Sequence, residues 1–110
     1  MSGDEATLVA LCRSAAEAMG VYVERIGQHR ADKAGSDRGV PDMLVYVAGK
    51  CIPCEFKRAK DRATGTPAGK LSYDQVVAME RRRERGVETH VVDSLDGFVA
   101  VVNAARRKRH

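Results

Sequence analysis

The sequence predicts a small α/β protein in which helices pack on the faces of a mixed sheet. Its 110 residues are enough for one compact domain with a core of its own. Segments with a helical period of apolar residues alternate with short β-rich segments in the order α-β-β-β-α-β-α, a pattern that favours such a layered fold. No apolar window approaches the ~18 residues of a membrane span. Because 31% of the residues are also charged, we expect a soluble protein.

The first part of the chain predicts a helix, a strand and a long loop. Apolar residues recur at helical spacing through 5–19, and Gly20 stops the helix. The segment 21–26 (VYVERI) alternates and is rich in β-formers, so it predicts a strand. The segment 27–39 is polar and contains glycine, which predicts an exposed loop of a length that is often functional.

The middle of the chain predicts a hairpin. The runs 43–49 and 51–59 are rich in apolar and β-branched residues, and the short turn Ala48-Gly49-Lys50 joins them. A second exposed loop is predicted over 60–70, where glycine, proline and charged residues replace the apolar pattern.

The last part predicts helix, strand and helix. Ser72 to Gln75 matches the S-x-x-Q capping box of a helix start, and Gly86 closes that helix. The segment 87–93 (VETHVVD) predicts a strand, and Ser94 caps a final helix that runs to about residue 106.

Glu55 and Lys57 occupy alternate positions of the predicted strand 51–59. Residues two apart on a strand share a face and lie about 6.5 Å apart, so both side chains are predicted to point the same way. The apolar residues between and before them, Ile52, Cys54 and Phe56, are predicted to point to the opposite face. The pattern therefore predicts one apolar face and one face that carries chemistry.

Asp42 stands behind a proline at the start of the preceding strand, where the hairpin would bring it next to Glu55. Two adjacent carboxylates repel each other unless a cation lies between them, and Mg²⁺ is typically held by one or two carboxylates, water and substrate phosphate. Lys57 would then orient the nucleophilic water and stabilise the charge that develops on the phosphate. A bare E-x-K also fits an exposed strand whose charged side chains pair with cross-strand neighbours.

The stretches GVPDMLVYVAGKCIPCEFKRAK (39–60) and GKLSYDQ (69–75) together resemble the VRR-NUC domain of the PD-(D/E)xK nuclease superfamily. The resemblance extends from about Glu5 to Val92 and implies a restriction-endonuclease-like core that uses Mg²⁺ or Mn²⁺ and no organic cofactor. The site residues that it implies are the metal carboxylates Asp42 and Glu55, the backbone carbonyl of Phe56, the N-terminal acid Glu5, the catalytic Lys57 and the helix glutamine Gln75.

Two of these positions have simpler interpretations. The capping box alone accounts for Gln75. Glu5 fits a first-turn acid that complements the helix dipole, and Asp4 is an equally good local candidate for the family's N-terminal acid.

Basic residues gather in the second half of the chain. Residues 1–50 hold 6 Lys and Arg against 7 Asp and Glu, whereas residues 51–110 hold 13 against 8. Much of the excess lies in two runs: Arg81, Arg82 and Arg83, and then Arg106, Arg107, Lys108 and Arg109. Such clusters are typical of proteins that bind a DNA backbone, although a solvated helix face and a frayed tail would look the same. Arg82 also stands where the family is expected to keep a core leucine.

The resemblance carries expectations about assembly and substrate. Stand-alone members of the family are short and resemble phage-encoded nucleases, and they are expected to cut four-way (Holliday) junctions as homodimers. Longer relatives act on flapped DNA as monomers. The sequence therefore predicts a structure-selective DNA endonuclease, with a flap or other branched-DNA nuclease as one alternative and a catalytically silent DNA-binding module as another.

The cysteines and the N-terminus bear on other classes of protein. The acidic N-terminus predicts no secretory signal, and the number of cysteines, three, is odd, so we expect no disulfide framework. The protein is expected in the cytoplasm of a prokaryotic or phage-infected host cell. Cys51 and Cys54 have C-x-x-C spacing, which would suit half of a zinc site or a redox pair, but the sequence offers no second paired motif. Ordinary strand cysteines are the alternative.

Overall fold

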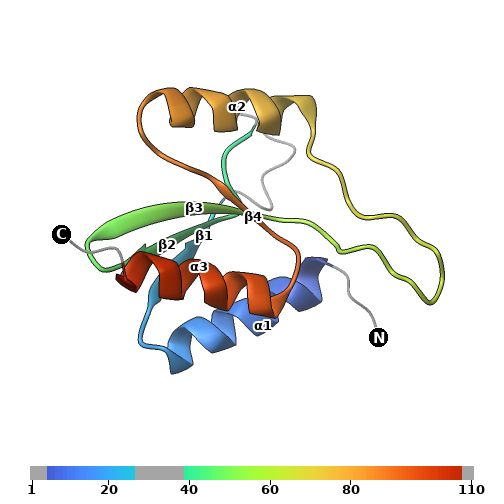
Figure 1. The fold of residues 1–110 in the computed structure, drawn as a ribbon, viewed down its shortest axis with the longest axis horizontal. Helices are drawn as coiled ribbons and strands as arrows, with labels where there is room; N and C mark the ends of the chain where they lie inside the picture. Colours follow the sequence, from blue (N-terminus) through green and yellow to red (C-terminus); the bar gives the residue numbers. More distant parts are fainter. Residues whose placement is uncertain (1–4, 27–38, 108–110) are drawn as a thin grey trace.

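The computed structural model describes residues 5–26 and 39–107, and its elements follow the order that the sequence predicts (Figure 1). The helices are α1 (Glu5–Ala18), α2 (Tyr73–Glu84) and α3 (Leu95–Arg107). The strands are β1 (Tyr22–Arg25), β2 (Met43–Val47), β3 (Lys50–Phe56) and β4 (His90–Val92). Most of the predicted 27–39 loop, Asp4, Lys108 and Arg109 lie outside the described residues.

The four strands form one mixed sheet in the order β1-β2-β3-β4. β1 and β3 both pair antiparallel with β2, and β3 pairs parallel with β4. Ala48 and Gly49 form the two-residue turn between β2 and β3, with φ values of 53° and 78°. Positive φ at both positions matches the right-handed twist of the flanking strands, so this turn fixes the register of the predicted hairpin.

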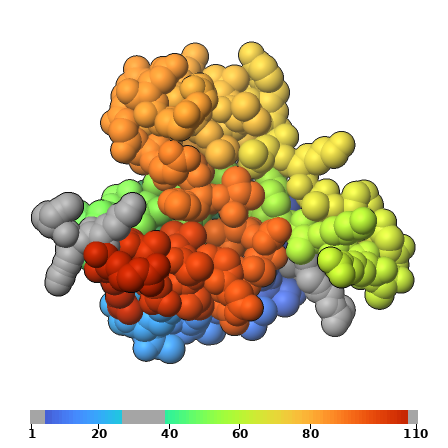
Figure 2. Space-filling view, viewed as in Figure 1, coloured from blue at the N-terminus to red at the C-terminus, as the bar shows by residue number. Residues whose placement is uncertain are grey.

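Helices cover both faces of the sheet, as predicted (Figure 1). α1 and α3 lie side by side on one face and α2 lies on the other, and the space-filling view shows the same three layers (Figure 2). The core fills the space between the sheet and the α1–α3 layer; its most buried members include Cys12, Met43, Val45, Cys54, Phe56, Phe98 and Val102. Within the described chain, α2 has no fully buried side chain and adds nothing to the core, and hydrogen bonds from Gln75 and Arg82 help to hold it in place.

All four strands are shorter than predicted: β1 and β2 lose one or two residues at their ends, and β3 and β4 differ more. β4 was predicted over 87–93 but begins at His90, which lies opposite Cys54. The preceding residue of β3 is Pro53, which has no N–H to donate, so the parallel ladder cannot extend toward residue 87. β3 was predicted through residue 59 but ends at Phe56, and one further bond, from the Lys57 N–H to the Val92 carbonyl at 3.0 Å, closes the ladder.

None of the helices in the described part of the chain is both long and apolar enough to cross a bilayer.

Candidate active site

Asp42 and Glu55 are neighbours at the point where β2 begins and β3 ends. Met43 pairs with Cys54 at the end of the ladder, and the next residue on each strand is Asp42 or Glu55. The two carboxyl groups are close enough for Asp42 to raise the pKa of Glu55, in keeping with the predicted hairpin. The Asp42 N–H donates to the Cys54 carbonyl at 3.1 Å, and its Oδ2 accepts a hydrogen bond from the Phe56 N–H at 2.8 Å. The backbone of β3 therefore fixes both the position of Asp42 and the direction of its carboxylate.

Glu55 is fully buried, with an exposed fraction of 0%. Its Oε1 accepts a hydrogen bond from Gln75 Nε2 at 3.1 Å, so Glu55 lies on the face of the sheet that α2 covers. Its Oε2 is buried without a hydrogen-bond partner among the described residues. Because Glu55 is buried, it is not the exposed strand residue of the alternative interpretation. An unpaired buried carboxylate oxygen is costly, and it leaves an acceptor to which a cation can bind.

Burial and the neighbouring Asp42 carboxylate raise the pKa of Glu55 from 4.5 to about 8. Both effects disfavour the charged form, the first through lost solvation and the second through repulsion between like charges. Arg82 and Lys57 act in the opposite direction because their positive charges favour the carboxylate. At neutral pH the metal-free protein therefore holds Glu55 mainly in its protonated form, and a bound cation would favour the ionised form.

This shift predicts a pH dependence of stability for the metal-free protein. The folded-state pKa lies above the unfolded value, so the folded protein binds more protons between pH 4.5 and about 8. The free energy of unfolding should consequently fall as pH rises through this window, by up to about 1.4 kcal/mol per pH unit from this group, and level off above it. Urea unfolding in EDTA at several pH values measures the effect. Glu55→Gln should remove it, and identical pH profiles for the two proteins would contradict the burial of an ionisable Glu55.

Gln75 completes the capping box that the sequence predicts and also contacts Glu55. Its Oε1 accepts a hydrogen bond from the Ser72 N–H at 2.8 Å, and the Ser72 hydroxyl accepts one from the Gln75 N–H at 3.1 Å, which completes the capping box. The capping contact fixes the amide so that its NH₂ group points to Glu55. The helix cap therefore orients one oxygen of the buried carboxylate.

Arg82 links α2 to the turn before β2 and to the segment before β4, a role that the sequence did not predict. Its guanidinium donates to the Gly39 carbonyl and to the Thr89 hydroxyl, each at 2.6 Å. Gly39 precedes the Val40-Pro41-Asp42 turn and has a φ of +85°. A Cβ at Gly39 would lie 2.4 Å from the Asp74 carbonyl oxygen, so only glycine lets this turn approach α2 so closely. The one signal in the sequence was an arginine at an expected core position.

The donor set fits a divalent cation. Two carboxyl groups lie close enough to interact, one of their oxygens is buried without a geometrically formed hydrogen bond to the described residues, and Mg²⁺ commonly completes its shell with water. Glu5 is exposed in the first turn of α1, and the described residues contain no group of three His, Cys, Asp or Glu that could together hold a metal ion. Ligation by Glu5 and by the Phe56 carbonyl therefore stays a prediction.

The predicted basic runs are partly engaged within the protein. Arg83 makes a two-oxygen ion pair with Glu80 at 2.8 and 2.9 Å, and Arg106 donates to the Met19 carbonyl at 2.6 Å. Arg81 and Arg107 are exposed. Contact between these runs and DNA stays a prediction.

The cysteines do not form the pair that their spacing suggested. Cys51 is exposed and Cys54 is buried, and both are free thiols. Residues three apart on a strand point to opposite faces, so the two sulfur atoms are not poised to share a metal ion or a disulfide. Burial, followed by the nearby Cys12, raises the pKa of Cys54 to about 12, which makes it an unreactive core residue.

Comparison with solved structures identifies the fold. One structure described as a VRR_NUC domain superposes with a TM-score of 0.66 and 21% identity over 93% of this chain and 97% of its own. A second, described as a VRR_NUC domain protein, gives a TM-score of 0.56 and 17% identity over 78% of this chain and 68% of its own. Neither protein-family models nor curated proteins match the sequence. The restriction-endonuclease-like fold predicted from the sequence is confirmed.

Proposed function

We propose that this protein, which has the fold of VRR_NUC domains, is a Mg²⁺- or Mn²⁺-dependent endonuclease that hydrolyses phosphodiester bonds in branched DNA. One observation carries the proposal: the carboxyl groups of Asp42 and Glu55 lie close enough to interact, and Glu55 Oε2 is buried without a geometrically formed hydrogen bond to the described residues. A structural ion pair would have paired that oxygen, whereas a cation site needs it unpaired.

The proposed roles follow from the contacts of each side chain. Asp42 and Glu55 would hold the cation, with Glu5 and the Phe56 carbonyl as further candidate ligands. When bound, the cation supplies positive charge that makes water a better nucleophile and stabilises negative charge on the phosphate. The Phe56 N–H orients Asp42, and Gln75 orients Glu55.

Lys57 follows Glu55 by two residues and is near enough to lower its pKa. Its ammonium would lie beside the scissile phosphate, where it stabilises the charge that develops as water attacks phosphorus and the bond to the 3′ oxygen breaks. The departing oxygen takes up a proton, and the products are a 5′ phosphate and a 3′ hydroxyl.

The preferred substrate in this proposal is a four-way junction cut by a homodimer in the cytoplasm of a prokaryotic or phage-infected cell. Two copies related by a two-fold axis match the symmetry of such a junction and present two sites to it. The experiment compares wild-type cleavage of a labelled four-way junction, a flap and a plain duplex in Mg²⁺ and in EDTA. Faster Mg²⁺-dependent cutting of the junction supports the proposal, a preference for the flap selects the flap nuclease, and binding without cutting selects the silent module.

The assembly and the C-terminal basic run give a separate prediction. Light scattering at micromolar concentration should report a mass of two chains. If Arg106, Arg107, Lys108 and Arg109 all contact phosphate, replacing them with glutamine should flatten the dependence of log K on log salt by up to about 3 to 4 units. A monomer would contradict the junction assignment, and an unchanged salt slope would remove the run from the DNA interface. The glutamine variant also loses the hydrogen bond from Arg106 to the Met19 carbonyl, so circular dichroism must show that its fold is intact.

A further inference from the structure

The chain between β3 and α2 forms an arm that leaves the body of the protein (Figures 1 and 2). This segment, 57–70, is called the basic arm below. Its two sides are joined by a bond from the Asp61 N–H to the Thr66 carbonyl at 2.9 Å, and its tip closes with a bond from the Gly65 N–H to the Asp61 carbonyl at 2.8 Å. The arm therefore has a defined shape although residues 59–68 are exposed throughout.

The base of the basic arm adjoins the candidate active site. Arg58 donates to the Pro67 carbonyl at 2.9 Å, and the Gly69 N–H donates to the Arg58 carbonyl at 2.8 Å. The part of the arm that leads back to α2 passes beside Lys57: a Cβ placed on Gly69 would lie 3.6 Å from both Cβ and Cδ of Lys57. The arm thus begins at the candidate catalytic lysine and extends outward from it.

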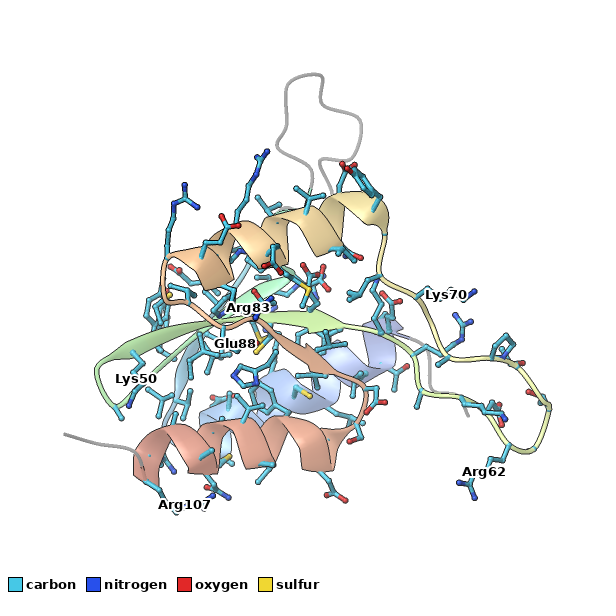
Figure 3. The ribbon with its side chains drawn as sticks, turned by 45° about the horizontal axis from the view of Figure 1, so that its top comes forward. Lys50, Arg62, Lys70, Arg83, Glu88 and Arg107 are labelled. Carbon is cyan, nitrogen blue, oxygen red and sulfur yellow. The ribbon has the colours of Figure 1, made fainter. Side chains whose placement is uncertain are left out.

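The charge on the basic arm is almost entirely positive. It carries five cations, Lys57, Arg58, Lys60, Arg62 and Lys70, against the single acid Asp61. The Asp61 carboxylate already accepts hydrogen bonds from the Ala63 and Thr64 N–H groups at 3.0 and 3.4 Å. Figure 3 shows Arg62 and Lys70 projecting from the arm, at the opposite end of the molecule from Lys50 and Arg107.

We propose that the basic arm binds the sugar-phosphate backbone of the DNA next to the bond that is cut; the inference rests on the proposed nuclease function. The arm has no aromatic residue on which a base could stack, so contact with phosphates is the recognition that its chemistry allows. It also has no large apolar residue to enter a membrane. Because Arg107 lies at the far end, the arm supplies a contact beside the site that the C-terminal run does not.

The test compares two triple variants at the exposed positions of the basic arm. One removes the charges (Lys60→Gln, Arg62→Gln and Lys70→Gln), and the matched control keeps them (Lys60→Arg, Arg62→Lys and Lys70→Arg). Fluorescence anisotropy with a labelled junction in EDTA measures affinity without cleavage. Removing the charges should flatten the slope of log K against log salt by up to about 2.7 and lower affinity roughly 10- to 100-fold at 0.1 M salt, since each phosphate contact contributes a slope of about 0.9. The control should bind like the wild type.

The outcomes separate this inference from the nuclease proposal. Unchanged affinity and salt slope in the charge-removing variant would overturn the arm's role even if the wild type cuts DNA. The arm would be assigned to a membrane surface, and the inference overturned, if the charge-removing variant still bound DNA like the wild type but lost a wild-type ability to bind phosphatidylserine vesicles. A reduced slope in the charge-removing variant supports the arm as a DNA contact, even for a wild-type protein that binds DNA without cutting it.

Discussion

Replacing Glu55 with glutamine, or Asp42 with asparagine, is expected to abolish DNA cleavage and leave the fold intact. Each change removes one negative charge from the proposed cation site, and losing several kcal/mol of transition-state stabilisation corresponds to a rate lower by about 10³-fold or more. The fold should survive because asparagine Oδ1 can still accept from the Phe56 N–H, and glutamine Oε1 can still accept from Gln75. Single-turnover cleavage in Mg²⁺ gives the rate, and circular dichroism reports the fold.

The stability of these two variants carries independent information. At pH 8 and above, the metal-free Glu55→Gln protein should be more stable than the wild type, because the buried charge and its repulsion with Asp42 are gone. Glu84→Gln provides the control: Glu84 is an exposed acid on α2 that lies 3.8 Å from Arg85, so its loss should change neither rate nor stability appreciably. Full activity in either site variant would remove the nuclease proposal.

Lys57→Ala is expected to lower the cleavage rate by about 10²- to 10³-fold with little loss of DNA affinity. Stabilisation of charge that appears only in the transition state affects the chemical step, whereas one phosphate contact among several contributes little to binding. Single-turnover rates and anisotropy measured on the same junction separate the two effects. Lys60→Ala is the matched control: Lys60 is an exposed cation on the same arm, and its loss should leave the cleavage rate unchanged and cost about as little affinity as the loss of Lys57. A Lys57 variant that cuts normally but binds weakly would reassign the lysine to simple backbone contact.

Much of the fold could be predicted because local and global signals agree. The capping box at Ser72, the positive-φ turn at Ala48-Gly49 and the apolar periodicity of the first and last helices each fix an element from a few neighbouring residues. The strand ends were less predictable. β4 begins at His90 because the next position along β3 is Pro53, which has no N–H to donate. That effect can be predicted only when the partner strand is known.

The proximity of Asp42 and Glu55 was also predictable, since a short turn between the two strands brings their far ends together. The predicted turn included Lys50, which the structure places in β3. The burial of Glu55 was not predictable, because it depends on α2 folding over the sheet from a distant part of the sequence. The hydrogen bonds from Arg82 to Gly39 and Thr89 likewise join segments whose proximity no local pattern encodes. The same holds for the passage of Gly69 beside Lys57, which places the basic arm at the site.

The most direct test of a cation-dependent site at Asp42 and Glu55 is cleavage of a labelled four-way junction with the metal supplied and withdrawn. Wild-type protein freed of metal with EDTA should leave the junction intact, should cut it when Mg²⁺ or Mn²⁺ is added in excess, and should stop when EDTA is restored. Under the same conditions Glu55→Gln should bind the junction and leave it uncut. Equal cutting with and without the metal, or equal cutting by Glu55→Gln, would contradict the account.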